Sequence, residues 1–158
     1  MFDDLLAANR RYASKFHDRG VAGKAARRLA VLTCIDSRID PLAMLGLLPG
    51  DAKIIRNAGA RVTEDALRSL ILAVNLLDVD RVCVVQHTDC AMAKASDAQI
   101  RDRIGAGDDF VPLAMTDQIS ALREDVTRIR ESKYIPAATE VAGFMFDVHT
   151  GELVPADV

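Results

Sequence analysis

The apolar positions of the chain gather in short runs separated by more polar segments. Mostly apolar runs rich in β-forming residues predict strands over 29–36, 52–59 and 81–90. Residues 141–154 predict a last strand followed by a turn. The first and third runs are apolar almost throughout, which is typical of strands that are covered on both faces.

Between these runs, apolar residues recur at helical spacing. This spacing predicts an amphipathic helix over 2–17 and a second helix, apolar nearly all round, that ends near Leu77 with Thr63 as its N-cap. Short helical pieces are expected as far as Ile104. A further helix is expected to begin near Thr116, with one apolar face made by Ile119, Leu122, Val126 and Ile129.

Strands that alternate with helices indicate the α/β class, with a mainly parallel sheet flanked by helices. The chain has no internal repeat, no low-complexity tract and no linker, so we expect a single domain over 1–158. In sheets of this kind, ligands collect beyond the carboxyl ends of the strands. Residues that bind a ligand or act in catalysis are therefore expected at those ends.

Charge and hydropathy exclude several classes of partner. The net charge is −3, and no segment concentrates Lys and Arg, so we expect no nucleic-acid partner. The longest apolar run, 70–77, is too short to span a bilayer, so we expect no membrane segment. A small molecule is the expected substrate.

The three cysteines do not form a disulfide framework in this interpretation. The first residues carry two acids where a secretory signal has basic residues, so we expect a cytoplasmic protein. In a reducing compartment, an odd number of cysteines indicates metal binding, catalysis or simple burial. Cys83 lies in the middle of a strand and is expected to pack in the core.

Cys34, His87 and Cys90 follow two different apolar runs, where the strands end. Two thiolates and one imidazole suit zinc and leave a fourth tetrahedral position for water or substrate. Because Cys34 lies far from the other two along the chain, the fold itself must assemble the site. The sequence thus predicts a Zn²⁺ site with an open position.

Asp36 and Arg38 extend the pattern beyond Cys34. In an extended chain they point to the same face as Cys34, so Asp36 is expected to approach the metal and to pair with Arg38. A carboxylate paired with arginine stays ionised and can accept a hydrogen bond from metal-bound water. Since two thiolate ligands reduce the net charge of the metal, we expect activity to rise toward alkaline pH.

Other polar residues have plainer interpretations. Arg56 and Asn57 either line the pocket or only fix the loop after their strand, and Gly59 is a candidate substrate contact. Asp89 is expected to cap the turn that follows it. The remaining histidines, His17 and His149, are expected to be solvated.

The motifs Cys34-x-Asp36-x-Arg38, Arg56-Asn57-Ala58-Gly59 and His87-x-x-Cys90 together resemble the β-class carbonic anhydrases, especially the short bacterial forms, over nearly the whole chain. The resemblance implies a parallel sheet with an antiparallel extension. It also implies a homodimer, or a dimer of dimers, in which the N-terminal helix packs on the partner.

The same resemblance implies a carbonate dehydratase, in which zinc-bound hydroxide converts carbon dioxide reversibly to bicarbonate and Asp36 and Arg38 form the orienting dyad. In some members the aspartate moves onto zinc, so Asp36 is a candidate fourth ligand in a closed state. The chain departs from the family at Ala91, where glycine is usual, and this puts the local backbone in question.

Three alternatives remain open at this stage. The same metal site would suit hydrolysis of carbonyl sulfide or carbon disulfide, which are linear molecules open to the same attack. A catalytically silent zinc-binding or anion-binding homologue would keep the site without turnover. A redox role for Cys34 and Cys90 leaves His87 and Asp36 unexplained.

Overall fold

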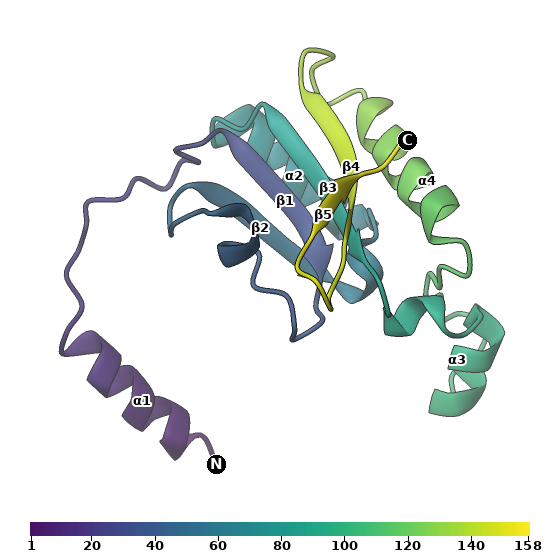
Figure 1. Cartoon of the computed structure of the whole chain (residues 1–158), viewed down its shortest axis with the longest axis horizontal. Coiled ribbons are helices and arrows are strands. Elements are labelled where there is room, and N and C mark those ends of the chain that lie inside the picture. The colour runs from purple at the N-terminus through teal and green to yellow at the C-terminus, as the bar shows by residue number, and fades with distance from the viewer.

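A five-stranded sheet in the order β2-β1-β3-β4-β5 forms the centre of the computed structural model, which describes all residues, 1–158 (Figure 1). The first four strands run parallel, and β5 is antiparallel to β4. The strands are β1 Leu29–Cys34, β2 Ala52–Asn57, β3 Arg81–His87, β4 Glu140–Phe146 and β5 Leu153–Pro155. The predicted α/β class and mainly parallel sheet are confirmed, and β5 is the antiparallel extension that the family resemblance implied.

Helix α1 precedes the first strand, and three further α-helices and three 3₁₀ turns lie between the strands. The helices are α1 Asp3–Ala13, α2 Glu64–Leu76, α3 Asp97–Ile104 and α4 Gln118–Arg130, and the turns are η1 Ala43–Leu45, η2 Ala58–Ala60 and η3 Ala91–Ala93. The predicted cap of α2 is confirmed, because the Thr63 side chain accepts a bond from the Ala66 amide. None of the helices combines the length and apolar composition needed to cross a membrane.

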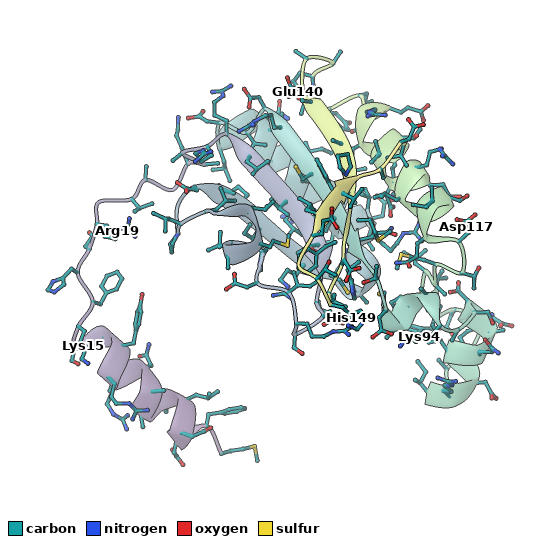
Figure 2. The ribbon with its side chains drawn as sticks, in the orientation of Figure 1. Lys15, Arg19, Lys94, Asp117, Glu140 and His149 are labelled. Carbon is teal, nitrogen blue, oxygen red and sulfur yellow. The ribbon has the colours of Figure 1, made fainter.

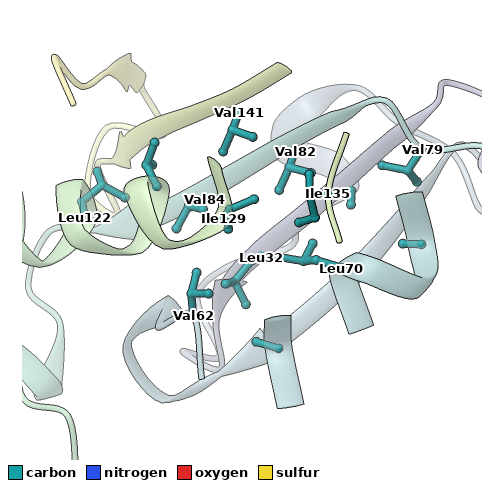
Figure 3. Close-up of a cluster of buried hydrophobic side chains, with 14 of the residues drawn as sticks. Leu32, Val62, Leu70, Val79, Val82, Val84, Leu122, Ile129, Ile135 and Val141 are labelled. Atoms are coloured by element: carbon teal, nitrogen blue, oxygen red, sulfur yellow. The ribbon is translucent and has the colours of Figure 1, made fainter. Parts of the chain in front are cut away.

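Helices α2 and α4 cover one face of the sheet and share its main core (Figure 3). Leu122, Val126 and Ile129 of α4 are fully buried there, as predicted. Ile119 was assigned wrongly to this inner face, since 44% of its side chain is exposed. Residues that the figure labels in this core include Leu32, Val62, Leu70, Val82, Val84 and Val141.

The opposite face of the sheet packs mainly against loops and short turns, and Ala121 of α4 also reaches it. A second apolar cluster forms there around Val31, Val85, Met115 and Phe146, and Cys83 packs against it. The prediction that Cys83 is a packing residue agrees with this position, and burial raises the pKa of its thiol. Cys34 and Cys90 belong to the same cluster, at the carboxyl end of the sheet.

Helix α1 stands away from the rest of the chain at the end of an extended segment (Figure 1). It has no buried residue. Large apolar side chains on it and beside it are exposed: Phe2, Leu5, Leu6, Tyr12 and Phe16. The helix predicted at 2–17 therefore exists in shortened form with its apolar face uncovered. That 1–158 acts as one domain stays a prediction.

Candidate metal centre

Cys34, His87 and Cys90 come together at the carboxyl ends of two neighbouring strands. Cys34 ends β1 and His87 ends β3, and these strands run parallel with Thr33 opposite Val85. The turn after β3 brings Cys90 back to the same place. The three potential ligand atoms lie within 4.8 Å of one another, and all three residues are buried. This is a spacing at which one ion can contact all three.

The orientation of His87 fits a metal ligand. Its Nδ1 lies 2.8 Å from the carbonyl oxygen of Thr88, which can only accept, so Nδ1 carries the proton and Nε2 carries a lone pair. That Nε2 is buried and has no hydrogen-bond partner. The Gln118 side chain donates to the carbonyl of His87 at 2.9 Å and so fixes its backbone from α4. An unpartnered, buried lone pair directed at two thiols is what a bound metal would satisfy.

The two thiols interact strongly with each other. A hydrogen bond from Cys90 lowers the pKa of Cys34, helped by the backbone amides of Asp36 and Gly59 and opposed by burial. The Cys34 thiolate in turn raises the pKa of Cys90. A bound cation would favour the thiolate form of both residues.

Asp36 and Arg38 form a two-pronged ion pair beside these ligands. Arg38 donates from Nε to Oδ1 at 2.9 Å and from Nη2 to Oδ2 at 2.7 Å, and its backbone amide adds a bond at 2.9 Å. These bonds hold the pKa of the Asp36 carboxyl well below its usual range. Asp36 Oδ2 lies 3.9 Å from His87 Nε2, so an ionised carboxylate borders the metal position.

Asp89 has a different role from the predicted one. Its side chain caps no turn, but accepts from Arg38 Nη1 at 2.8 Å and pairs with Lys94. These two cations lower the pKa of Asp89 to about 2, and Lys94 has the larger effect. The backbone of Asp89 is left-handed, with φ 56°, which Asp tolerates better than most residues. The turn carries Asp89 toward Arg38, and no local sequence pattern indicated that contact.

Residues at the carboxyl end of β2 hold the loop that carries Cys34 and Asp36. Arg56 donates from Nε to the Cys34 carbonyl at 2.9 Å and from Nη2 to the Asp36 carbonyl at 2.7 Å. The side chain of Asn57 accepts from the amide of Arg61 at 2.9 Å and donates to its carbonyl at 2.7 Å. Of the two interpretations of Arg56 and Asn57, these contacts favour the fixing of loops.

Gly59 lies against the first ligand itself. Its amide donates to Cys34 Sγ at 3.4 Å, and its backbone has φ 78°. A Cβ atom at this position would lie 2.9 Å from Met115 Cε. Glycine is therefore required here for both conformation and space, and its N–H group is directed at the thiol rather than at open pocket.

A buried ion pair, which the sequence analysis did not predict, holds the segment that follows Gly59 against α4. Arg61 Nε donates to Asp125 Oδ2 at 2.7 Å, and the Val62 amide donates to Asp125 Oδ1 at 2.9 Å. Burial raises the pKa of the Asp125 carboxyl, against the effect of these donors. In the sequence, the one sign of this pair is that Asp125 is a charged residue on the otherwise apolar face of its helix.

Ala91 does not distort the site. It is the first residue of η3 and is absent from the residues with positive φ, so its backbone does not need glycine. The backbone question raised by alanine at this position is therefore answered, because the conformation found here is open to any residue. His17 and His149 are exposed, as predicted.

Comparisons with known proteins agree in fold and sequence. A family model described as carbonic anhydrase matches residues 29–112. Beta-carbonic anhydrase 1 of Mycobacterium tuberculosis is 36% identical, over 96% of this chain and 94% of the relative. A carbonic anhydrase crystal structure from Streptococcus mutans superposes with a TM-score of 0.91 at 34% identity, covering 99% of this chain and 97% of that one. A carbon disulfide hydrolase from an Acidianus strain is 30% identical, over 80% of this chain and 76% of the relative.

Proposed function

Because the chain belongs to the β-carbonic anhydrase family, we propose that it is a zinc-dependent carbonate dehydratase that converts carbon dioxide reversibly to bicarbonate. One observation carries the proposal. Three buried ligand atoms lie within 4.8 Å of one another, and the ionised Asp36 stands beside them. This arrangement combines a place for a metal with a fixed hydrogen-bond acceptor.

Cys34, His87 and Cys90 would hold the metal, and zinc is the cation that best suits this donor set. When bound there, zinc would lower the pKa of a water in its fourth position toward neutrality and so supply a nucleophile. The protein provides the burial and the fixed ligand orientation, since His87 is held at both its ring Nδ1 and its backbone carbonyl.

Asp36 would act as the hydrogen-bond acceptor for that water and so direct the oxygen lone pair at carbon dioxide. Arg38 keeps the carboxylate ionised and fixes both of its oxygen atoms. In a closed state, Asp36 would leave Arg38 and become the fourth ligand, a short movement given its position 3.9 Å from His87 Nε2. Gly59 would border the substrate through its Cα, because its N–H group is bound to Cys34.

Assembly and location belong to the same proposal. An uncovered apolar face on α1 would be buried by a second copy of the chain, as a homodimer or as part of a dimer of dimers. A cytoplasmic location fits ligand cysteines that must stay reduced.

Carbon disulfide and carbonyl sulfide are the second candidate substrates. The relative from Acidianus that is named a carbon disulfide hydrolase favours this alternative. Both molecules are linear and present an electrophilic carbon, so the same ligands and the same acceptor would serve. Release of hydrogen sulfide from either substrate distinguishes this activity from carbon dioxide hydration.

Stopped-flow measurement of carbon dioxide hydration on protein of known zinc content tests the proposal, from about pH 6.5 to about pH 9. We expect activity that rises with pH and is lost in Cys34→Ser and Asp36→Asn. Cys83→Ser is the matched control, since this third cysteine lies outside the ligand set, and it should keep both zinc and activity. One zinc per chain with no hydration would leave hydrolysis of carbon disulfide or carbonyl sulfide, and then a silent binding protein.

A further inference from the structure

Two carboxylates from different loops hold the guanidinium group of Arg38. Asp36 accepts from Nε and Nη2, as described above. Asp89 accepts from Nη1 at 2.8 Å through its side chain and from Nη2 at 3.2 Å through its carbonyl. The position of Arg38 is therefore determined by the turn after β3 as well as by its own loop.

That turn is fixed to the sheet. The Thr88 amide donates to the Phe146 carbonyl at 2.9 Å, and the Val148 amide donates to Thr88 Oγ1 at 3.1 Å. Asp89 follows directly, in the left-handed conformation that turns its side chain back. The second anchor of Arg38 thus stands on the β3–β4 ladder and does not depend on Asp36.

Lys94 completes a row of alternating charges, Asp36, Arg38, Asp89 and Lys94. It pairs with Asp89 Oδ1 and leaves Oδ2 for Arg38. Figure 2 shows Lys94 on the side of the molecule opposite Glu140, the first residue of β4, and so beyond the carboxyl end of the parallel strands. The side chains of Asp89 and Lys94 are 37% and 61% exposed, and ion pairs this open contribute little to global stability. We therefore expect them to affect the position of the Arg38 guanidinium group and not the stability of the fold.

We propose that Asp89 and Lys94 are positioning residues that keep the Arg38 guanidinium in place, so that Asp36 retains its orientation and can return to it after any movement. The inference rests on the proposed function for its catalytic consequence, but the anchoring of Arg38 is a property of these side chains alone. A guanidinium held only by Asp36, two residues away on the same loop, would move with it.

The test uses three variants of the full-length, zinc-loaded protein. Asp89→Asn keeps the size and tolerates the left-handed backbone, but it removes the charge. Lys94→Met removes the outer cation. Asp78→Asn is the matched control, because Asp78 also has a positive φ of 60° and pairs with a lysine, Lys24, at 2.8 Å, but makes no contact with the site. Hydrogen exchange of the Arg38 Nε–H group by NMR, assigned through Arg38→Lys, reports anchoring directly, and kcat/KM reports its consequence.

In Asp89→Asn we expect Arg38 Nε–H exchange to accelerate and kcat/KM to fall, each by at least about tenfold, since misplacing a positioning group by about 1 Å can cost on the order of 100-fold. Lys94→Met should change both in the same direction by less, and it decides the test if Asp89→Asn does not fold. In both variants, the zinc content and the Tm should match those of the Asp78→Asn control. Exchange and kcat/KM within about twofold of the control in both variants would overturn the proposal. If the unaltered protein hydrates no carbon dioxide, the proposed function fails, while the exchange rates still decide whether Arg38 is anchored.

Discussion

Replacing Gly59 by alanine should damage both the stability of the protein and its metal site. The residue has φ 78°, a conformation that costs an L-amino acid about 1–2 kcal/mol. The new Cβ would also lie 2.9 Å from Met115 Cε, 3.3 Å from Met115 Sδ and 3.4 Å from Met92 Cβ. Met115 is only 1% exposed and has little room to move, so overpacking should add about 1–3 kcal/mol. The expected loss of unfolding free energy is about 2–5 kcal/mol.

A second glycine separates these two contributions. Gly151 has nearly the same φ, 77°, but no atom lies within 4 Å of a Cβ built there, so Gly151→Ala carries the backbone cost alone. Urea unfolding of both variants gives the difference. The Gly59 variant should also bind zinc about 10-fold to 100-fold more weakly, because its amide supports Cys34 Sγ. If Gly59→Ala is no less stable than Gly151→Ala, the packing argument is wrong.

Three further predictions concern the scaffold. Asp125→Ala removes the buried partner of Arg61 and leaves the exposed Glu124, at 3.5 Å, as its carboxylate partner. The variant should lower the unfolding free energy by about 3–5 kcal/mol in urea, and a loss below about 1 kcal/mol would contradict this account of the pair. Deleting residues 1–16 should convert the proposed dimer or dimer of dimers to monomers in light scattering while the circular dichroism of the sheet is kept. An unchanged number of chains per particle would exclude α1 as the contact. Asp117 caps α4, and the bonds that it accepts from the Ser120 amide and hydroxyl lower its pKa in the folded protein. Its charge therefore stabilises the fold at pH values above its pKa in the unfolded chain, about 3.9. This stabilisation is lost as the pH falls through the lower pKa of the folded state. Thermal unfolding of Asp117→Asn should therefore show a deficit at neutral pH that disappears in acid.

The sequence was sufficient for the parts of this structure that rest on local pattern. Apolar runs predicted β1, β2 and β3, and Thr63 predicted the start of α2, because strand burial and helix capping depend on neighbours in the chain. The exposure of Ile119, in the first turn of α4, could not be predicted in this way. It depends on where the first turn of α4 meets β3 and β4, which only tertiary packing determines.

The residues of the candidate site also fall into two groups, those that local sequence pattern predicted and those that only tertiary packing brings together. Cys34, His87 and Cys90 stood out because thiol and imidazole at strand ends are chemically distinctive. The contact of Asp89 with Arg38 and that of Arg61 with Asp125 join residues about fifty and sixty positions apart. Nothing in the spacing of such charges separates a specific pair from solvated ones. These supporting contacts became visible only when the loops were placed.

Two of the three potential ligands, Cys34 and His87, are held by groups from different elements of the fold. Arg56 of β2 binds the carbonyl of Cys34, and Gln118 of α4 binds the carbonyl of His87. The distance between the Cys34 thiol and the His87 imidazole therefore depends on the register of β1, β2 and β3. A slip of one residue would turn Cys34 to the opposite face of the sheet. Since the buried side chains under α2 and α4 fix that register, the main core determines the geometry of a site to which it contributes no ligand.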